Sequence, residues 1–516
     1  MRDELLNIFQ ESGDKHYIEL TNARFTDIRN NCYYRSGTSL IIHKGRIDRI
    51  IDRNETNSKM ADITVDLGGK TVIPGLFNTH CHIQMTLPAI LPGIGDILSN
   101  KLHFRKQLEK NMTDCLLHGV THIRDALTDD LKGNRLLREK IESGKLPGPR
   151  IYQSVLVGPE NGNFTSQRSS FVRTVFSLRN TPTLDFDNPD SGIVAFPAYA
   201  GLKEIRRAVD CAIERGAQFI KLYEQKQDWF TGNFKARFMS QEQLNMLVDY
   251  AHSKGIMTTI HHVSLESFRR ALAAGVWSLA HLPGDGILSE NDIRVLLDSG
   301  CILEPTATVL YHLCWPVKGD ELGNHENMRA LTDYRNKTYE SVSNPFWMEP
   351  LQKRLIKGFG RINNGNFRLN FALDASPLFR VYARSIIACV ENLKMLRQAA
   401  VPFGCGNDAG AVCAAEGMVG HELELISLFL GFGSEPDSAF GIDALKTATL
   451  NSARALGINR DFGSIDVNKV ADLVVIDGDP LRDPAIIGKK ADMVFMDGKP
   501  VVCDGQLVRV PSTSLF

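Results

Sequence analysis

The sequence predicts an α/β fold: a (β/α)8 TIM barrel with a small β-sandwich domain built from both chain ends. The middle of the chain alternates short apolar runs with amphipathic helical patterns, as βαβ units around a parallel sheet do. The count of eight such runs favours a closed barrel over a doubly wound open sheet. We therefore expect residues 1–68 and 459–516 to form the sandwich and residues 69–458 to form the barrel.

Composition excludes several classes of protein. The 516 residues carry 59 Lys+Arg and 60 Asp+Glu, a net charge of −1, with 43% hydrophobic and 23% charged residues. These values exclude a mostly disordered chain and argue against a dedicated nucleic-acid binder, which needs a basic face. The low net charge is compatible with a homo-oligomer that acts on small molecules.

The chain's ends and cysteines indicate a cytoplasmic protein. The first ten residues contain Asp3 and Glu4 and lack the apolar region of a secretory signal. No apolar run reaches the roughly 18 residues that a membrane-spanning helix needs. The ten cysteines are scattered without a CxxC pair, which is typical of reduced, mostly buried thiols.

Short strands and turns are predicted at both ends. Residues 17–25 alternate apolar and polar side chains, and residues 39–51 contain two apolar runs around a hairpin-like turn at His43-Lys44-Gly45-Arg46. Near the C-terminus, β-rich runs are split by Asp-Gly turns. These runs occupy residues 471–480, 491–502 and 505–510.

The eight barrel strands are predicted from the apolar runs. They are expected at residues 71–80, 119–127, 150–158, 217–224, 256–263, 276–282, 301–308 and 401–408. Amphipathic helices are expected between several of them, at residues 202–216, 241–255, 265–275 and 290–300. Each of these helical patterns ends in glycine, which favours helix termination and a turn into the next strand.

Two connections exceed the usual length. About 40 residues separate the third and fourth strands, and about 90 separate the seventh and eighth, against the few residues that are typical. Both leave the C-terminal ends of strands, where barrels place their active sites. We expect either a lid over the substrate or a peripheral or oligomer-contact insertion.

Candidate metal ligands follow the strand ends. His80-Cys81-His82 ends the first strand, and residues i and i+2 of a strand face the same side, so both imidazoles can bind one metal while Cys81 packs away from it. His261 ends the fifth strand with His262 beside it, His281 ends the sixth, and Asp408 ends the eighth. Two surface histidines would be the simpler interpretation of HxH alone.

Lys221 lies inside the otherwise apolar segment FIKLY of the fourth strand. A buried lysine is costly unless its charge is neutralised or paired. With a depressed pKa its amine is nucleophilic and can take up CO2 as a carbamate, an anionic ligand that can bridge two cations. A snorkelling or salt-bridged lysine is the alternative.

These segments resemble the amidohydrolase superfamily. The resemblance is carried by PGLFNTHCH (74–82), FIKLY (219–223), His261 with ALAAGVWSLAH (271–281), and GND (406–408). The tail is similar to the imidazolonepropionase-like and prolidase-like branch through HELELI (421–426), ALKTATLNSARALGI (444–458) and GSIDVNKVADLVVIDGDPL (463–481).

The resemblance implies a binuclear metal centre. Its ligands would be His80, His82, Lys221 as a bridging carboxylated lysine, His261, His281 and Asp408. Zinc is favoured, with manganese or iron as alternatives. The implied reaction is attack of a metal-bridging hydroxide on a C–N amide bond of a peptide, N-acyl amino acid or cyclic amide, with Asp408 as general base and acid.

Two departures from the family pattern bear on the reaction. Deaminases of the superfamily carry Glu three positions after the strand-5 histidine, where this chain has Ser264, although Glu266 is near. Members of the branch also carry Gly-Gly-His after the third strand, where this chain has Glu160-Asn161-Gly162-Asn163. A deaminase of a ring substrate, or an ester or phosphoester hydrolase at the same centre, remains an alternative.

Substrate contacts are expected from residues near the strand ends. Tyr223 faces the same side as Lys221, and His421 begins a helix after the eighth strand. Tyr311 and His312 follow the seventh strand, while Arg168 and Arg173 in the first long insertion could bind a carboxylate. The alternatives are a packed aromatic side chain for Tyr223, a capping or core-edge histidine for His421, and solvated loop charges for the two arginines.

Overall fold

The computed structural model describes most of the chain. The described residues are 16–52, 61–84, 94–128, 130–160, 162, 188–225, 238–314, 346–347, 377–410, 414–431 and 440–508, with backbone alone for 94–101, 312–314 and 377–384. Most of the two long insertions, including Arg168, Arg173 and the His312 side chain, therefore lies outside the described part. The prediction that these insertions form a lid concerns those residues.

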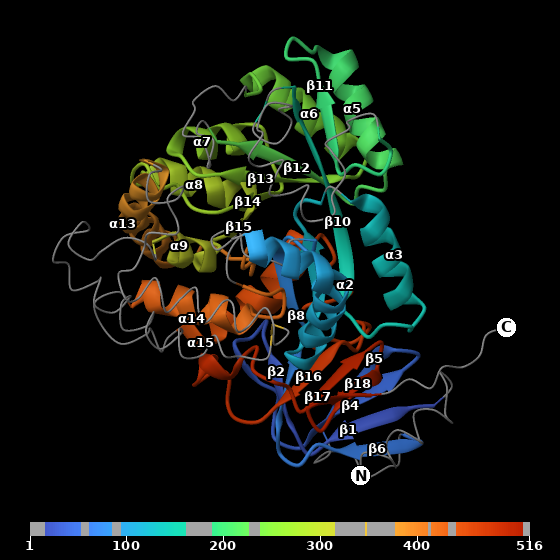
Figure 1. Ribbon diagram of the computed structural model, residues 1–516. Coiled ribbons are helices and arrows are strands. Elements are labelled where there is room, and N and C mark those ends of the chain that lie inside the picture. The colour runs from blue at the N-terminus through green and yellow to red at the C-terminus, as the bar shows by residue number, and fades with distance from the viewer. Residues whose placement is uncertain are drawn as a thin grey trace.

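The centre of the molecule is a nearly closed parallel barrel (Figure 1). Its seven strands are β8 (Leu76–Cys81), β9 (Val120–Asp125), β10 (Arg150–Pro159), β12 (Phe219–Glu224), β13 (Met257–His262), β14 (Ser278–Ala280) and β15 (Ile302–Glu304).

The eighth predicted strand closes the barrel without forming a long ladder. Parallel bridges join Phe403 to Leu303 on one side and Ala409 to Cys81 on the other. Backbone hydrogen bonds reinforce the closure: Gly404 N donates to Leu303 O at 2.8 Å and His82 N donates to Ala409 O at 2.8 Å. Because both edges are bridged, the barrel prediction is confirmed and the open sheet is excluded.

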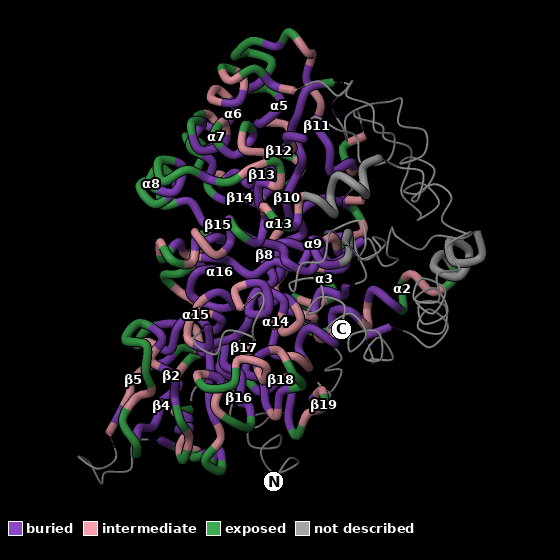
Figure 2. Tube along the Cα trace, turned by 90° about the vertical axis from the view of Figure 1, so that its left-hand side faces the viewer, coloured by how far each residue is buried: buried purple, intermediate pink, exposed green. Residues whose placement is uncertain are grey.

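Helices surround the strands. They are α2 (Ile94–Leu117), α3 (Leu131–Glu142), α5 (Leu202–Glu214), α6 (Gln241–Ser253), α7 (Leu265–Ala273), α8 (Glu290–Ser299), α9 (Ala307–Cys314), α13 (Pro377–Gln398), α14 (Val419–Leu430), α15 (Gly441–Lys446), a π-helix (Thr447–Asn451), α16 (Ser452–Ala455) and a short 3-10 helix (Pro484–Ile486). Figure 2 shows the barrel strands buried and the outer turns of α8 exposed.

The four helices predicted from amphipathic patterns are confirmed. In α5 the buried residues follow helical spacing, so one apolar stripe packs against the barrel. Ser240, Ser264 and Ser289 cap α6, α7 and α8 by accepting hydrogen bonds from backbone N–H groups of the first turn. The glycines that close the four patterns adopt the left-handed conformation, with φ of 88°, 75°, 72° and 67° at Gly216, Gly255, Gly275 and Gly300, respectively.

The two chain ends form two sheets that pack on one core. The first sheet runs β5 (Arg46–Asp52), β4 (Thr38–His43), β1 (Ile18–Thr21) and β6 (Ile63–Asp66). The second runs β19 (Gln506–Leu507), β18 (Lys499–Cys503), β17 (Met493–Met496), β16 (Leu473–Ile476), β7 (Thr71–Pro74), β2 (Arg24–Asp27) and β3 (Cys32–Tyr33). Leu20 and Leu40 of the first sheet share a core with Val72 and Phe495 of the second, as the sandwich prediction requires.

The first predicted barrel strand, residues 71–80, is in fact two strands. β7 pairs with β16 in the sandwich, and β8 pairs with β9 in the barrel. Gly75 separates them: its N–H donates to Asp472 O at 2.8 Å, and a Cβ there would lie 2.2 Å from Thr121 Oγ1. The continuous apolar run conceals this change of partner, because both strands are buried on both faces.

One strand of the barrel region was not predicted. β11 (Ile193–Phe196) lies in the insertion after the third strand and pairs in parallel with Leu156–Pro159 of β10, on the edge that β9 occupies at Arg150–Gln153. The long β10 therefore reaches past the barrel's C-terminal rim. Within the described residues, no helix is both long and apolar enough to cross a membrane.

Candidate active site

His80, His82 and Asp408 meet at the C-terminal end of the barrel strands. His82 Nε2 lies 3.0 Å from Asp408 Oδ1, and His80 Nε2 lies 3.6 Å from the same oxygen. The donor atoms of the three residues all fall within 4.8 Å of one another, so the group could hold a metal ion. Asp408 N donates to His80 O at 2.8 Å, which ties the closing segment to β8.

Two further histidines lie beside this group. The ring centroids of His261 and His281 are 4.4 Å apart, and those of His80 and His281 are 5.2 Å apart. His281 Nδ1 lies 2.7 Å from Thr306 Oγ1, and His261 Nε2 lies 2.7 Å from Gln225 Oε1. The four predicted histidines therefore converge, although they come from β8, the residue that follows β8, β13 and the residue that follows β14.

Lys221 points into the same region from β12. Its side chain is 3% exposed, and its Nζ has no hydrogen-bond partner among the described residues. Burial, assisted by the Arg124 cation, lowers the pKa of Lys221 to about 7, while Asp408 and Glu304 act in the opposite direction. A substantial fraction of the amine is therefore neutral near pH 7.

The remaining ionisable groups are in states suited to metal binding. Burial lowers the pKa of His80 and His261 well below the ordinary value, and that of His281 to about 3. Burial alone would raise the pKa of Asp408, but the His82 hydrogen bond and the neighbouring imidazoles hold it well below its usual range. Neutral imidazoles beside an ionised carboxylate are the forms that bind divalent cations.

Three residues at these strand ends have a strained backbone. His281, Thr306 and Asp408 have φ of 77°, 50° and 50°, in the left-handed region that non-glycine residues rarely adopt. Such outliers persist where the surrounding structure fixes the backbone, and they cluster at functional sites. Two of the three residues, His281 and Asp408, are predicted ligands.

The neighbours of the predicted ligands behave as the alternation of a strand requires. Cys81 is fully buried, and its Sγ donates to Arg124 O at 3.4 Å, which confirms it as a packing residue. His262 is also buried and packs edge-on against Phe268, with ring centroids 5.5 Å apart. Ser264, which stands where deaminases carry glutamate, caps α7: Ser267 N donates to its Oγ at 3.1 Å.

The predicted substrate contacts fall into two pairs. Tyr223 stacks on His261 with ring centroids 4.0 Å apart and donates its hydroxyl to Gln225 Oε1 at 2.9 Å. Tyr311 of α9 and His421 of α14 face each other at a centroid distance of 6.2 Å. The first pair therefore touches a predicted ligand, and the second joins the two helices that flank the closing segment.

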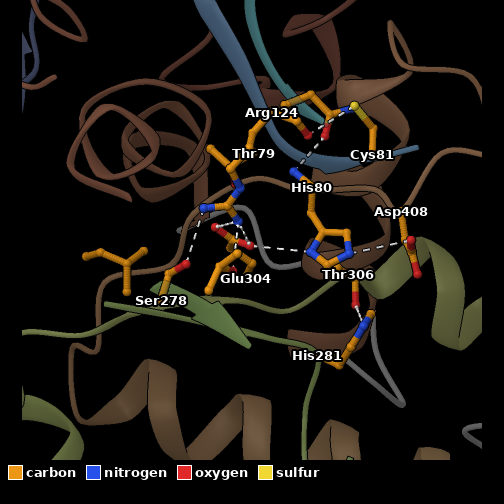
Figure 3. Close-up of polar contacts among 12 residues, drawn as sticks. Thr79, His80, Cys81, Arg124, Ser278, His281, Glu304, Thr306 and Asp408 are labelled. Carbon is orange, nitrogen blue, oxygen red and sulfur yellow. Dashed lines mark hydrogen bonds and ion pairs between the residues drawn. The ribbon is translucent and has the colours of Figure 1, made fainter. Parts of the chain in front are cut away.

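Three residues at the site were not predicted: Arg124, Glu304 and Gln225. Figure 3 shows Arg124 against Glu304, Glu304 beside His80, and Asp408 beyond His80. A signal for the first two exists, because Arg124 and Glu304 are charges inside apolar strand segments, as Lys221 is. Gln225 follows the end of β12 and carries no comparable signal.

Comparison with known proteins identifies the family. The model of the amidohydrolase family matches residues 71–508. A 5-methylthioadenosine/S-adenosylhomocysteine deaminase of Moorella thermoacetica is 26% identical over 141 residues, covering 25% of this chain and only 32% of that protein. A 5'-deoxyadenosine deaminase of Methanothermobacter thermautotrophicus is 23% identical over 492 residues, covering 89% of this chain and 88% of that protein.

Solved structures share the fold. A crystal structure of a prolidase complexed with N-methylphosphonate-L-proline has a TM-score of 0.65 and 19% identity, covering 94% of this chain and 100% of that one. The family predicted from the motifs is thus confirmed by the family model, and the architecture by the structure. The chain belongs to the amidohydrolase family and is a hydrolase that acts on carbon–nitrogen bonds.

Proposed function

We propose that this chain is a metal-dependent hydrolase that cleaves a C–N amide bond in a small molecule. The observation that carries the proposal is the convergence of six side chains suited to divalent cations: His80, His82, Lys221, His261, His281 and Asp408. In the proposed centre, His80, His82 and Asp408 would hold one cation, His261 and His281 would hold the second, and Lys221, once carboxylated, would serve as a ligand to both. Zinc suits imidazole and carboxylate donors, and manganese or iron suits them as well.

The described residues fit such a centre. Lys221 Nζ is a buried polar atom without a hydrogen-bond partner, which is costly unless a further group completes the site. The donor atoms of His80, His82 and Asp408 already lie within 4.8 Å of one another. Their chemistry, two imidazoles with a carboxylate, supports a divalent cation rather than an organic cofactor.

When bound, the metal ions lower the pKa of a coordinated water and polarise the substrate's carbonyl oxygen. Asp408 is proposed to accept a proton from the attacking water and to return it to the leaving nitrogen. Its depressed pKa keeps it ionised for the first of these steps. Tyr223 and Gln225, which lie beside His261, are proposed to contact the substrate. The Tyr311–His421 pair of α9 and α14 is proposed to form a second set of substrate contacts.

A deaminase is the second candidate, because the two relatives described above are named as deaminases of adenosine derivatives. The local structure argues against it. Ser264, at the position where the superfamily's deaminases carry an acid, is engaged as the cap of α7. Glu266 lies in the first turn of that helix. Ester or phosphoester hydrolysis would use the same centre and is tested by the same assay.

A substrate screen tests the proposal. N-acyl amino acids, X-Pro dipeptides, cyclic amides, 5'-deoxyadenosine and a carboxylic and a phosphate ester are each incubated with protein loaded with Zn²⁺ or Mn²⁺. We expect metal-dependent release of an amine or amino acid from one of the amide classes. Release of ammonia from 5'-deoxyadenosine, with no amide hydrolysed, would instead establish the deaminase, and turnover confined to the esters would establish an esterase.

A further inference from the structure

A buried ion pair lies inside the barrel below the predicted metal ligands. Arg124 of β9 and Glu304 of β15 are both 0% exposed. A single guanidinium nitrogen, Nη2, donates to Oε1 at 2.8 Å and to Oε2 at 2.7 Å. Neither residue lies on the surface or in an insertion, so the pair belongs to the barrel's interior.

The surrounding barrel fixes the arginine in place. Its Nη1 donates to Ser278 Oγ at 3.3 Å and its Nη2 donates to Thr259 Oγ1 at 3.2 Å. The guanidinium carbon lies 5.1 Å from the centroid of the Phe219 ring. Arg124 thus contacts three further strands and holds the Glu304 carboxylate at one position.

Stability alone is a poor explanation for this pair. The desolvation of two buried charges offsets most of their attraction, and apolar replacements of similar volume are often neutral or stabilising. A charged pair in a barrel interior therefore calls for another role. The structure offers one, because Glu304 Oε2 lies 3.5 Å from His80 Nδ1.

His80 lies between two carboxylates. Its Nδ1 faces Glu304, and its Nε2 faces Asp408 at 3.6 Å (Figure 3). A neutral imidazole that offers Nε2 to a cation carries its proton on Nδ1, and metal-binding histidines commonly donate that proton to a carboxylate or carbonyl. At 3.5 Å, His80 Nδ1 and Glu304 Oε2 face each other without a hydrogen bond, and a small approach of the ring to Glu304 would form one.

The other histidines have neutral partners on their second nitrogen. His82 Nδ1 lies 3.3 Å from Leu127 O, and His281 Nδ1 lies 2.7 Å from Thr306 Oγ1. His80 is thus the one of these three histidines whose Nδ1 faces a carboxylate. A carboxylate increases the basicity of the imidazole more than a carbonyl or a hydroxyl does.

We infer that Glu304, clamped by Arg124, is a positioning residue for the metal centre. Its carboxylate would accept a hydrogen bond from the Nδ1–H group of His80. That hydrogen bond would fix the tautomer and the ring orientation in which His80 Nε2 can bind a cation together with His82 and Asp408. The inference rests on the proposed function, because it assumes that His80 is a ligand. It adds that the strength of this site is set partly by two residues that touch neither metal nor substrate.

Metal titration of Glu304→Gln tests the inference. Metal-stripped protein is titrated with Zn²⁺ against a chromophoric chelator, and we expect the affinity of one of the two sites to fall about 10- to 100-fold while the other is unchanged. Asp292→Asn is the matched control, since it neutralises another buried carboxylate that an arginine, Arg269, contacts at both oxygens, here in α7 and α8 outside the barrel interior, and it should bind Zn²⁺ as the wild type does. Wild-type affinity in a folded Glu304→Gln variant would overturn the inference.

A double-mutant cycle separates positioning from a general structural role. In the His80→Ala background, Glu304→Gln should cause no further loss of Zn²⁺ affinity, whereas an equal further loss would show that Glu304 does not act through His80. If Glu304→Gln does not fold, Arg124→Lys takes its place: it keeps a cation but loses the contact with both oxygens. A smaller loss of affinity at the same site would support the inference, and wild-type binding would contradict it.

The two proposals fail in different ways. A wild-type chain that binds no divalent cation would refute the proposed function. A wild-type chain that binds Zn²⁺ and hydrolyses an amide, with Glu304→Gln identical to it in metal affinity, would refute only the role of Glu304.

Discussion

Two buried lysines show how differently this chain treats the same side chain. Lys221 in the barrel is 3% exposed and Lys469 near the sandwich is 4% exposed. Lys469 Nζ donates to Asn459 O at 2.8 Å, Phe462 O at 2.9 Å and Ser464 Oγ at 2.5 Å. Lys221 Nζ has no hydrogen-bond partner among the described residues.

The pKa does not distinguish the two lysines, whereas the hydrogen bonds do. Burial is the main cause in both cases, lowering the pKa of Lys221 to about 7 and that of Lys469 to about 8. A lysine with three acceptors completes a local structure, here the connection between α16 and β16. A lysine with none indicates a site that a further group completes.

The largest expected effect is that of Lys221→Ala. Without the bridging residue, we expect loss of bound metal and a fall in kcat/KM of at least about a thousandfold, or about 4 kcal/mol of barrier. Short carboxylic acids added to the assay should partly restore activity by occupying the place of the carbamate. Elemental analysis and steady-state kinetics measure both effects, and full activity in this variant would exclude the bridge.

Lys469→Met should lower the stability of the protein without removing bound metal. It leaves the carbonyls of Asn459 and Phe462 and the Ser464 hydroxyl without their donor, which should lower the free energy of unfolding by about 2 kcal/mol. Metal content should stay at the wild-type value. Urea denaturation of the variant beside the wild type measures the loss, and an unchanged midpoint would show that the three hydrogen bonds contribute nothing net.

The smallest expected effect is a dependence of metal loading on pH. The ammonium form of Lys221 cannot react with CO2, and with a pKa of about 7 it makes up roughly 90% of the population at pH 6 but only about 10% at pH 8. Carboxylation should therefore be lost as the pH falls through 7. Burial keeps the pKa of His281 at about 3, and those of His80 and His261 are also depressed, so these imidazoles stay neutral over this range.

Incubation with ¹³C-bicarbonate followed by ¹³C NMR at pH 6 and pH 8 measures the carbamate directly. The Lys469→Met variant should follow the wild-type profile, because that residue lies outside the site. A carbamate signal of equal size at both pH values would show that the titration of Lys221 does not control carboxylation.

Much of the fold could be predicted because the barrel strands lie in apolar runs, several of which end in or are followed by a polar side chain. The same rule placed the predicted ligands, since the carboxyl ends of parallel strands meet at one rim. It could not show that the chain changes sheets at Gly75, because both halves of that run are buried. Nor could it pair Arg124 with Glu304, which lie in separate strands 180 residues apart and meet only once the barrel closes.

The proposed function depends on divalent cations at the rim of the barrel, which the reaction would require. Elemental analysis of protein purified without chelator, combined with an amide hydrolysis assay on the same preparation, tests it most directly. We expect about two divalent ions per chain and an activity that falls when they are removed and returns when they are restored. A metal-free preparation that hydrolyses its substrate at the full rate would contradict it.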